Sequence, residues 1–187
     1  FNLFKFLLNR IDDDIDASGR TAFHIAAQRS DSRFLLEFLN RGRNVNERDG
    51  KNRTPLHYAA GKGKISNVKL LLQKGAYVDT KDIKNRKPID YVQIGITNSD
   101  NELKKLRSKL EKRRQVTMPP PDNIEEQIAY YDKKMENLRN IMTMLEEAQE
   151  RQEAARREAA KGLMDLQEGS RERRDAAEGL MEMVKAQ

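Results

Sequence analysis

Apolar residues along this chain fall into short clusters that are separated by polar turns. The clearest unit of this pattern runs from Asp49 to Asp82. Within it, Thr54-Pro55-Leu56-His57 begins a short helix, because a proline near a helix start loses no backbone hydrogen bond. A second helix has its apolar positions at Val68, Leu70, Leu71 and Leu72, and Gly75 should end it in the left-handed conformation. Two short helices cannot bury their own apolar faces, so the pattern predicts stacked copies of the unit.

Copies of the unit lie 33 residues away in both directions. The repeated positions are the pairs Thr21 and Thr54, His24 and His57, Pro55 and Pro88, Tyr58 and Tyr91, Gly42 and Gly75, and Asp49 and Asp82. The period and the core Thr-Pro-Leu-His-x-Ala-Ala resemble the ankyrin repeat. The copy at 12–48 keeps most of this core, whereas the copy at 82–114 lacks both its threonine and its histidine.

This resemblance implies an all-α fold with a helical solenoid over residues 1–114. Its parts are a half repeat at 1–11, repeats at 12–48 and 49–81, and a degenerate capping repeat at 82–114. Within the last repeat, Gly95 to Ser99 predicts a loop, after which Ser99 or Asp100 caps a second helix. One apolar stripe follows that helix, at Leu103, Leu106 and Leu110, and its polar remainder suits the end of an array.

Three prolines, Pro119 to Pro121, place a linker at 115–122. Residues 123–187 then predict a long coiled-coil-like helix, or a helical hairpin that turns at Gly169. A seam of residues spaced alternately four and three apart, as in coiled coils, runs through Ile124, Ile128, Tyr131, Met135, Leu138, Met142 and Leu145. This seam either assembles with a helix of a partner or a second copy, or packs on its own chain. Further along, the seam positions are occupied by the polar residues Gln149, Gln152 and Arg156. Apolar residues return at Leu163, Leu166, Leu180 and Val184.

The residues that carry most enzyme chemistry are scarce in this sequence. The chain has no cysteine and two histidines, His24 and His57, both at the repeat position where the ankyrin family uses the ring to hydrogen-bond neighbouring turns. Gly61-Lys62-Gly63-Lys64 lacks the preceding strand of a phosphate-binding loop. We therefore expect no catalytic residues, no cofactor and no metal site, and we expect that the protein is not an enzyme.

Partner-binding positions follow from the resemblance, since ankyrin partners usually dock on the turn fingers and first helices. Here these positions are Arg20, Lys51, Arg53, Lys84 and Arg86 in the fingers, and Gln28, Arg29, Tyr58, Lys62 and Tyr91 in the first helices. Arginine with tyrosine is typical of protein-interface hot spots. The basic stripe favours an acidic protein partner. Two other interpretations stay open: a nucleic acid, because such a stripe also attracts phosphate, and a solvated face without a ligand.

Charge is distributed unevenly along the chain, whose net charge is +6. Residues 1–99 contain 18 basic and 11 acidic side chains, whereas residues 122–187 contain 11 basic and 16 acidic ones. Such asymmetry suggests electrostatically chosen partners, or contact between the two halves. No apolar run reaches the roughly 18 residues that span a bilayer, and the narrow apolar face of 103–110 argues against membrane binding.

The sequence thus predicts a scaffold or adaptor whose ankyrin face binds one protein and whose C-terminal helix assembles with another helix or a large complex. The alternatives are a basic module in a ribonucleoprotein and the regulatory part of a larger enzyme. We expect an intracellular protein, cytoplasmic, cytoskeletal or ciliary, with the nucleus as an alternative. Because the chain starts at Phe1 within what resembles a repeat, we expect it to be a fragment.

Overall fold

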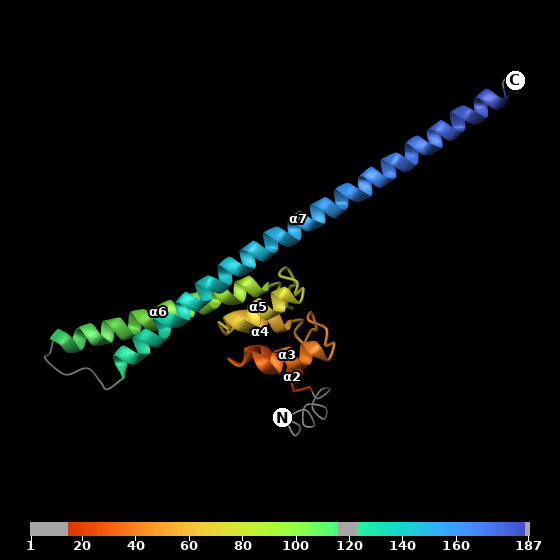
Figure 1. The fold of residues 1–187 in the computed structure, drawn as a ribbon. Coiled ribbons are helices and arrows are strands. Elements are labelled where there is room, and N and C mark those ends of the chain that lie inside the picture. Colours follow the sequence, from red (N-terminus) through yellow and green to blue (C-terminus); the bar gives the residue numbers. More distant parts are fainter. Residues whose placement is uncertain (1–14, 116–122, 186–187) are drawn as a thin grey trace. The chain divides into compact units, whose positions relative to one another are not determined.

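The computed structural model describes residues 15–115 and 123–185, with side chains described for 15–112, 123–164 and 178 (Figure 1). Within this part the chain forms helices and no strand, apart from one isolated bridge between Ile15 and Thr21. The helices are α2 (Ala22–Gln28), α3 (Ser32–Asn40), α4 (Pro55–Gly61), α5 (Ile65–Gln73), α6 (Pro88–Gln115) and α7 (Ile124–Lys185). The predicted all-α fold is confirmed. The predicted half repeat at 1–11 and most of the 115–122 linker lie outside the described residues. The chain divides into two compact units, Phe1–Ala148 and Gln149–Gln187.

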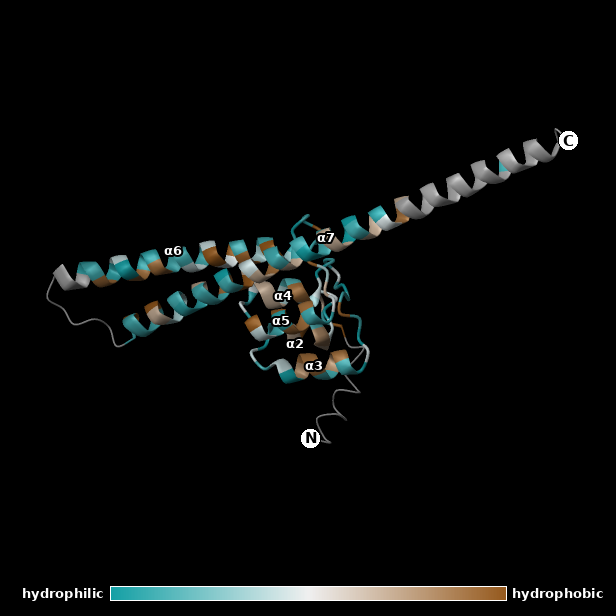
Figure 2. Ribbon diagram, turned by 45° about the horizontal axis from the view of Figure 1, so that its top comes forward, coloured by the Kyte–Doolittle hydropathy of each residue, from teal (hydrophilic) through white to brown (hydrophobic). Residues whose placement is uncertain are grey.

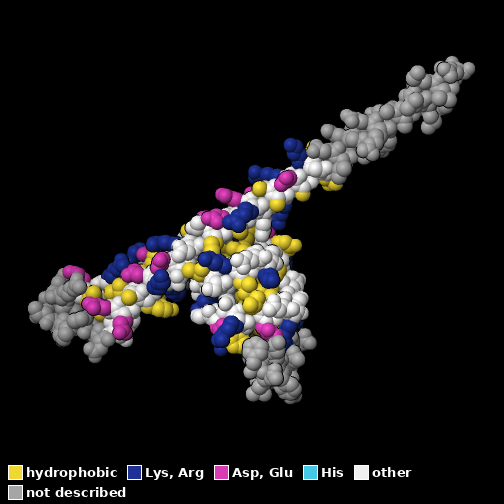
Figure 3. All heavy atoms as spheres, viewed as in Figure 1, with side chains coloured by type: hydrophobic (Ala, Val, Ile, Leu, Met, Phe, Trp, Pro, Cys, Tyr) yellow, Lys and Arg dark blue, Asp and Glu magenta, His cyan; other side chains and the backbone are white. Residues whose placement is uncertain are grey.

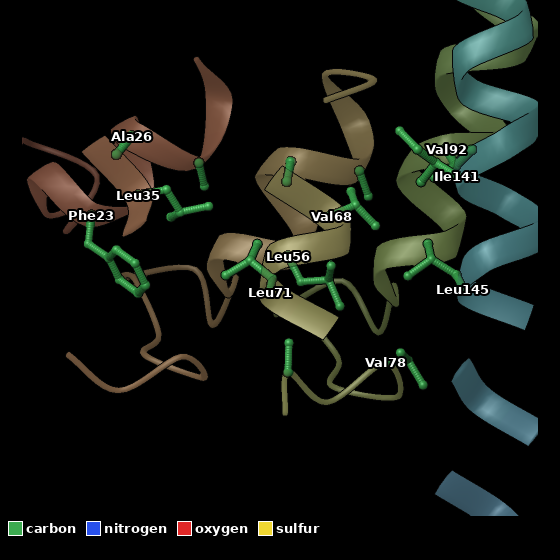
Figure 4. Close-up of a cluster of buried hydrophobic side chains, with 14 of the residues drawn as sticks. Phe23, Ala26, Leu35, Leu56, Val68, Leu71, Val78, Val92, Ile141 and Leu145 are labelled. Carbon is green, nitrogen blue, oxygen red and sulfur yellow. The ribbon is translucent and has the colours of Figure 1, made fainter. Parts of the chain in front are cut away.

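Two helix pairs, α2–α3 and α4–α5, form the stacked repeats of the first unit. α2 packs against α3 and α4, and α4 packs against α5 and α6. Gly75 ends α5 with a φ of +82°, as predicted. The core between the pairs uses apolar positions one period apart, all of them almost inaccessible to solvent: Phe23 and Leu56, Leu35 and Val68, and Phe38 and Leu71. Figure 4 labels Phe23, Leu35, Leu56, Val68 and Leu71 among them.

The third repeat departs from the sequence prediction. No loop forms between Gly95 and Ser99, and α6 continues without a break from Pro88 to Gln115. One cause is visible at the turn position, where Gly63 of the second repeat has a φ of +68°. Ile96 occupies this position 33 residues later. Because a β-branched residue rarely adopts a positive φ, the turn is disfavoured and the helix continues.

The same repeat also lacks the residues of a second helix. Asn101 and Lys104 stand one period after the buried Val68 and Leu71. A second helix at this position would therefore place an amide and an ammonium group in the core, where an unpaired polar group is unfavourable. Since the third repeat forms no second helix that could pack on α5, the apolar side of α5 must be buried by another part of the chain.

α7 provides that cover. Leu138, Ile141 and Leu145 are buried to within 2% and join the same core cluster as Val68 and Leu71. Figure 4 shows α7 beside α6, with Ile141 next to Val92 of α6 and Leu145 further along α7. Residues about 70 positions away thus take the place of the second helix of the third repeat.

Two glycines make room for Leu138. A Cβ atom built on Gly95 would lie 3.2 and 3.3 Å from the two methyl carbons of Leu138, and one on Gly63 would lie 3.6 Å from one of them. Gly95 is therefore not the loop glycine that the sequence suggested. Its missing side chain instead lets a leucine of α7 approach the backbone of α6.

α6 and the first part of α7 lie antiparallel. Arg107 of α6 binds Asp132 of α7 at 3.1 Å, while Gly95, earlier in α6, contacts Leu138, later in α7. Apolar and polar residues alternate along both helices (Figure 2). The predicted stripe of α6 is covered accordingly, with Leu103 buried and both Leu106 and Leu110 half-buried.

The seam predicted on α7 is covered within its own unit. Four of its positions are buried, at Ile124, Met135, Leu138 and Leu145, and three are half-buried, at Ile128, Tyr131 and Met142. Of the two alternatives left open by the sequence, packing on its own chain is the one that the structure adopts. α7 also continues through Gly169, where the sequence had allowed a hairpin. In the part of the chain that the structure describes, no helix has the length and apolar character needed to cross a bilayer.

Replacing Leu138 tests the role of α7 in the array. We expect Leu138→Ala to lower the free energy of unfolding by about 2–5 kcal/mol, because it empties a fully buried site. Urea unfolding of the chain, followed by tyrosine fluorescence, measures this change. Asn140→Ala, at an exposed position of the same helix, is the control and should change it by less than about 0.5 kcal/mol. Similar small effects of both variants would contradict the packing of α7 on α5.

Candidate functional site

Each repeat begins with a finger turn that is closed by an aspartate. In the second repeat, the Asp49 carboxylate accepts hydrogen bonds from the backbone N–H groups of Lys51 and Arg53, both at 2.8 Å. The same pair of bonds recurs at Asp16 and Asp82. The turn residue with positive φ is one that tolerates this conformation in every repeat, namely Gly19 at +69°, Asn52 at +57° and Asn85 at +61°. The fingers are therefore defined by local chemistry.

An arginine and a tyrosine converge on the aspartate of the second and third fingers. Arg53 Nη2 lies 2.8 Å from Asp49 Oδ2, and the Tyr58 hydroxyl donates to the same oxygen at 2.5 Å. The Arg53 guanidinium also lies 4.7 Å from the centre of the Tyr58 ring, within the range of a cation–π contact. The third repeat has the same arrangement, with distances of 2.8, 2.6 and 4.7 Å, in the set Asp82, Arg86 and Tyr91.

These contacts keep the aspartates ionised although their side chains are buried. The carboxylates of Asp49 and Asp82 are 0% and 1% exposed. Burial alone would raise the pKa of each, but hydrogen bonds from the tyrosine and the arginine outweigh it, and both pKa values lie below the usual range. The first finger has Ile25 in place of the tyrosine, and there the hydrogen bonds from Arg20 lower the pKa of Asp16 to about 2.

Each histidine connects its own first helix to the next finger. The Thr54 N–H donates to Nδ1 of His57 at 3.0 Å, so the proton of the neutral ring is on Nε2, which donates to the Arg86 carbonyl at 3.2 Å. His24 bonds to Thr21 in the same way, and its Nε2 donates to the carbonyl of Glu47, which lies two residues before the second finger. Both rings are fully buried, and burial lowers the pKa of each. The structural role implied by the family resemblance fits this geometry.

The predicted partner-binding residues separate into two groups. Five of them form the finger contacts described above and are not independent cations or hydroxyls: Arg20, Arg53, Arg86, Tyr58 and Tyr91. The other five take no part in these finger contacts, and four of them are exposed: Arg29, Lys51, Lys62 and Lys84, with Gln28 half-buried. On the face that Figure 3 shows, Lys and Arg side chains are scattered and do not form one continuous patch.

Apolar residues on the same elements were missed by the sequence analysis. Ile83, at the start of the third finger turn, is 60% exposed, and Ile25, on α2, is 42% exposed. Ile25 stands one period before Tyr58, so the repeat alignment could have identified it.

The structural role of Asn67 was also missed by the sequence analysis. Its buried amide donates to the carbonyls of Ala27 and Arg29 at 2.9 and 2.8 Å and so fastens α5 to the preceding repeat.

No cluster of His, Cys, Asp and Glu that could hold a metal ion occurs within residues 15–115 and 123–185. The site thus consists of rigid fingers, four exposed cations and two exposed isoleucines. Such a surface can make polar and apolar contacts with another molecule.

Residues 1–82 match the family model described as ankyrin repeats (3 copies). This part of the chain is an ankyrin-repeat region, as its motifs indicated, and ankyrin repeats serve in general as protein–protein interaction modules. The match ends where the third finger begins, before the departure from the repeat pattern in α6. No curated protein matches the chain.

Stability should decrease on mild acidification. The neutral histidine rings have lowered pKa values, so between about pH 7.5 and 5.5 the unfolded chain binds more protons than the folded chain. The free energy of unfolding should therefore fall as the pH drops through about 6.5. A second decrease should follow below about pH 4, as Asp16, Asp49 and Asp82 are protonated.

Urea unfolding at a series of pH values measures both decreases. His57→Gln removes one of the two titrating rings, so its stability should depend less on pH between 7.5 and 5.5 than that of the unmodified chain. A stability that stays constant over this range in the unmodified chain would show that the rings do not titrate as the geometry requires.

Proposed function

We propose that this chain is a non-enzymatic interaction scaffold in which the ankyrin fingers and first helices bind a protein partner. The observation that carries this proposal is that different residues of the fingers have different roles, some structural and some exposed to solvent. Arginine holds each turn in place, and a tyrosine joins it in the second and third turns, from which Lys51 and Lys84 extend with exposed side chains. Because the backbone of the turn is held in one conformation, each lysine loses less conformational freedom when a partner binds.

The chemistry of this face favours an acidic protein segment with an apolar side chain. The exposed cations are Arg29, Lys51, Lys62 and Lys84. Ile83 precedes Lys84 directly and is 60% exposed, so a carboxylate and an apolar group of one partner can both be accommodated. Lysine–carboxylate pairs at the surface contribute little each, typically under about 1 kcal/mol. Apolar contact is therefore needed for appreciable affinity.

The same observations support a protein over a nucleic acid. Arginine binds phosphates well because its planar group makes two parallel hydrogen bonds. In the fingers, Arg20, Arg53 and Arg86 already use this group on aspartates. Breaking such a pair would leave a carboxylate without its cation, and in the second and third fingers that carboxylate is buried.

The second part of the proposal concerns α7. Its first part completes the array, whereas Leu163 and Met164 are 61% and 63% exposed. We assign assembly with another helix to the part of α7 beyond residue 148, in place of the seam 124–145 considered from the sequence. One chain would then bind a protein through its array and join a larger assembly through its C-terminal helix.

The finger lysines provide the test. We expect Lys51→Glu/Lys84→Glu to weaken binding of array partners by about tenfold, because two attractive charges become repulsive. Lys69→Glu/Lys74→Glu makes the same charge change at two exposed positions, one on α5 and one at its C-cap, and is the matched control. Immobilised chain captures partners from a cell extract, and quantitative mass spectrometry compares the three forms.

Proteins retained by the unmodified chain and the control, and lost from the finger variant, would support the proposal. Equal retention by all three forms would contradict it. RNA that is captured in a salt-sensitive way and lost from the finger variant would favour the nucleic-acid alternative.

A further inference from the structure

The C-terminal part of α7 presents apolar side chains to solvent. Every side chain from Ala154 to Met164 is exposed, including Leu163 and Met164 at 61% and 63%. Most helices in proteins gain their stability from packing an apolar face and not from helix propensity alone. Large exposed apolar residues on one segment therefore indicate an interaction surface.

The seam of the array-bound part continues into this segment in one register. Counting on from Leu145 in steps of four and three places residues 149, 152, 156, 159, 163, 166, 170, 173, 177, 180 and 184 on the seam. α7 is unbroken to Lys185, so these positions form one stripe, which drifts slowly around a straight helix and which supercoiling in a coiled coil brings onto one face. Apolar residues occupy most of them from position 159 onward: Ala159, Leu163, Leu166, Ala177, Leu180 and Val184. Met164 lies next to the seam and not on it.

The charge of this segment is compatible with a second copy as its occupant. Residues 149–187 contain nine acidic and eight basic side chains. Two copies therefore carry almost no net charge and do not repel each other. The seam is also continuous with one that already packs helix against helix in this chain, between α6 and the first part of α7.

The polar residues on the seam indicate whether two copies of this segment pair in parallel or in antiparallel orientation. In a parallel pair, position 173 would meet position 173 of the other copy, and arginine would face arginine; the same holds for Arg156. In an antiparallel pair with position 163 opposite 180, position 159 meets 184, 166 meets 177, and 170 meets 173. Apolar residues then meet apolar residues, and Arg173 meets a serine.

We propose that residues 159–184 of two copies pair as an antiparallel coiled coil, which joins two ankyrin arrays into one dimer. This inference rests on the assembly role proposed above for α7 and names a second copy of the chain as its partner. It does not depend on what the fingers bind.

Sedimentation velocity of the full chain tests the pairing. We expect a dimer for the unmodified chain and a monomer for Leu163→Asp at the same concentration, because the substitution places a charge in the apolar seam. Met164→Asp is the matched control, since Met164 is equally exposed and off the seam. It should leave the dimer intact. A monomeric unmodified chain, or equal effects of both substitutions, would overturn the proposal.

Disulfide cross-linking tests the orientation, and the chain has no cysteine of its own. Leu163→Cys mixed with Leu180→Cys should form a heterodimeric cross-link on oxidation, because these positions lie opposite each other. Leu163→Cys alone should not cross-link, since its two copies would be 17 positions, or about 26 Å, apart. Efficient cross-linking of Leu163→Cys alone would mean a parallel pair and would overturn the antiparallel assignment.

The capture experiment with the finger variants separates the two proposals. If the chain is monomeric and its fingers still select partners, the inference about α7 fails and the binding function stands. If Leu163→Asp is monomeric and captures the same partners as the unmodified chain, the two functions are independent, as proposed.

Discussion

The last repeat of any helical array must cover the apolar side of the repeat before it, and this requirement governs the whole first unit. Val68 and Leu71 of α5 need an apolar neighbour, yet the third repeat has Asn101 and Lys104 at the positions that should supply one. α7 meets the requirement with Leu138, Ile141 and Leu145. Three features make this contact possible: the extension of α6, the antiparallel α6–α7 pair, and the absence of a side chain at Gly95.

The fingers illustrate a different constraint, which is the cost of burying charge. A carboxylate as inaccessible as that of Asp49 is tolerated only when it is fully hydrogen-bonded. Two backbone N–H groups, an arginine and a tyrosine provide this, and the neighbouring histidine bridges to the next repeat. A residue set that resembles an interface hot spot is thus largely part of the scaffold, and the lysines beside it are left for binding.

The fold of the two full repeats could be predicted from the sequence because each of their features is local. The helix start at Pro55 and the turn at Gly75 follow from residues a few positions apart, and the role of His57 followed from the family resemblance. The third repeat could not be predicted in the same way, since its outcome depends on α7. One local signal was available: Ile96 stands one period after the turn residue Gly63, which disfavours a turn there. The adjacent Gly95 suggested a loop instead. The pairing of Arg53 with Asp49, four residues apart, was also within reach of the sequence.

The replacement of a local helix by α7 has a consequence for how the protein folds as it is synthesised. In an ordinary repeat array each repeat contacts only its neighbours, so a newly synthesised repeat can fold against the one before it. Here the apolar side of α5 is covered by residues of α7 about 70 positions later in the chain, and such a long sequence separation slows folding. Until then the nascent chain exposes the apolar side of its second repeat, and exposed apolar surface of this kind is prone to aggregation.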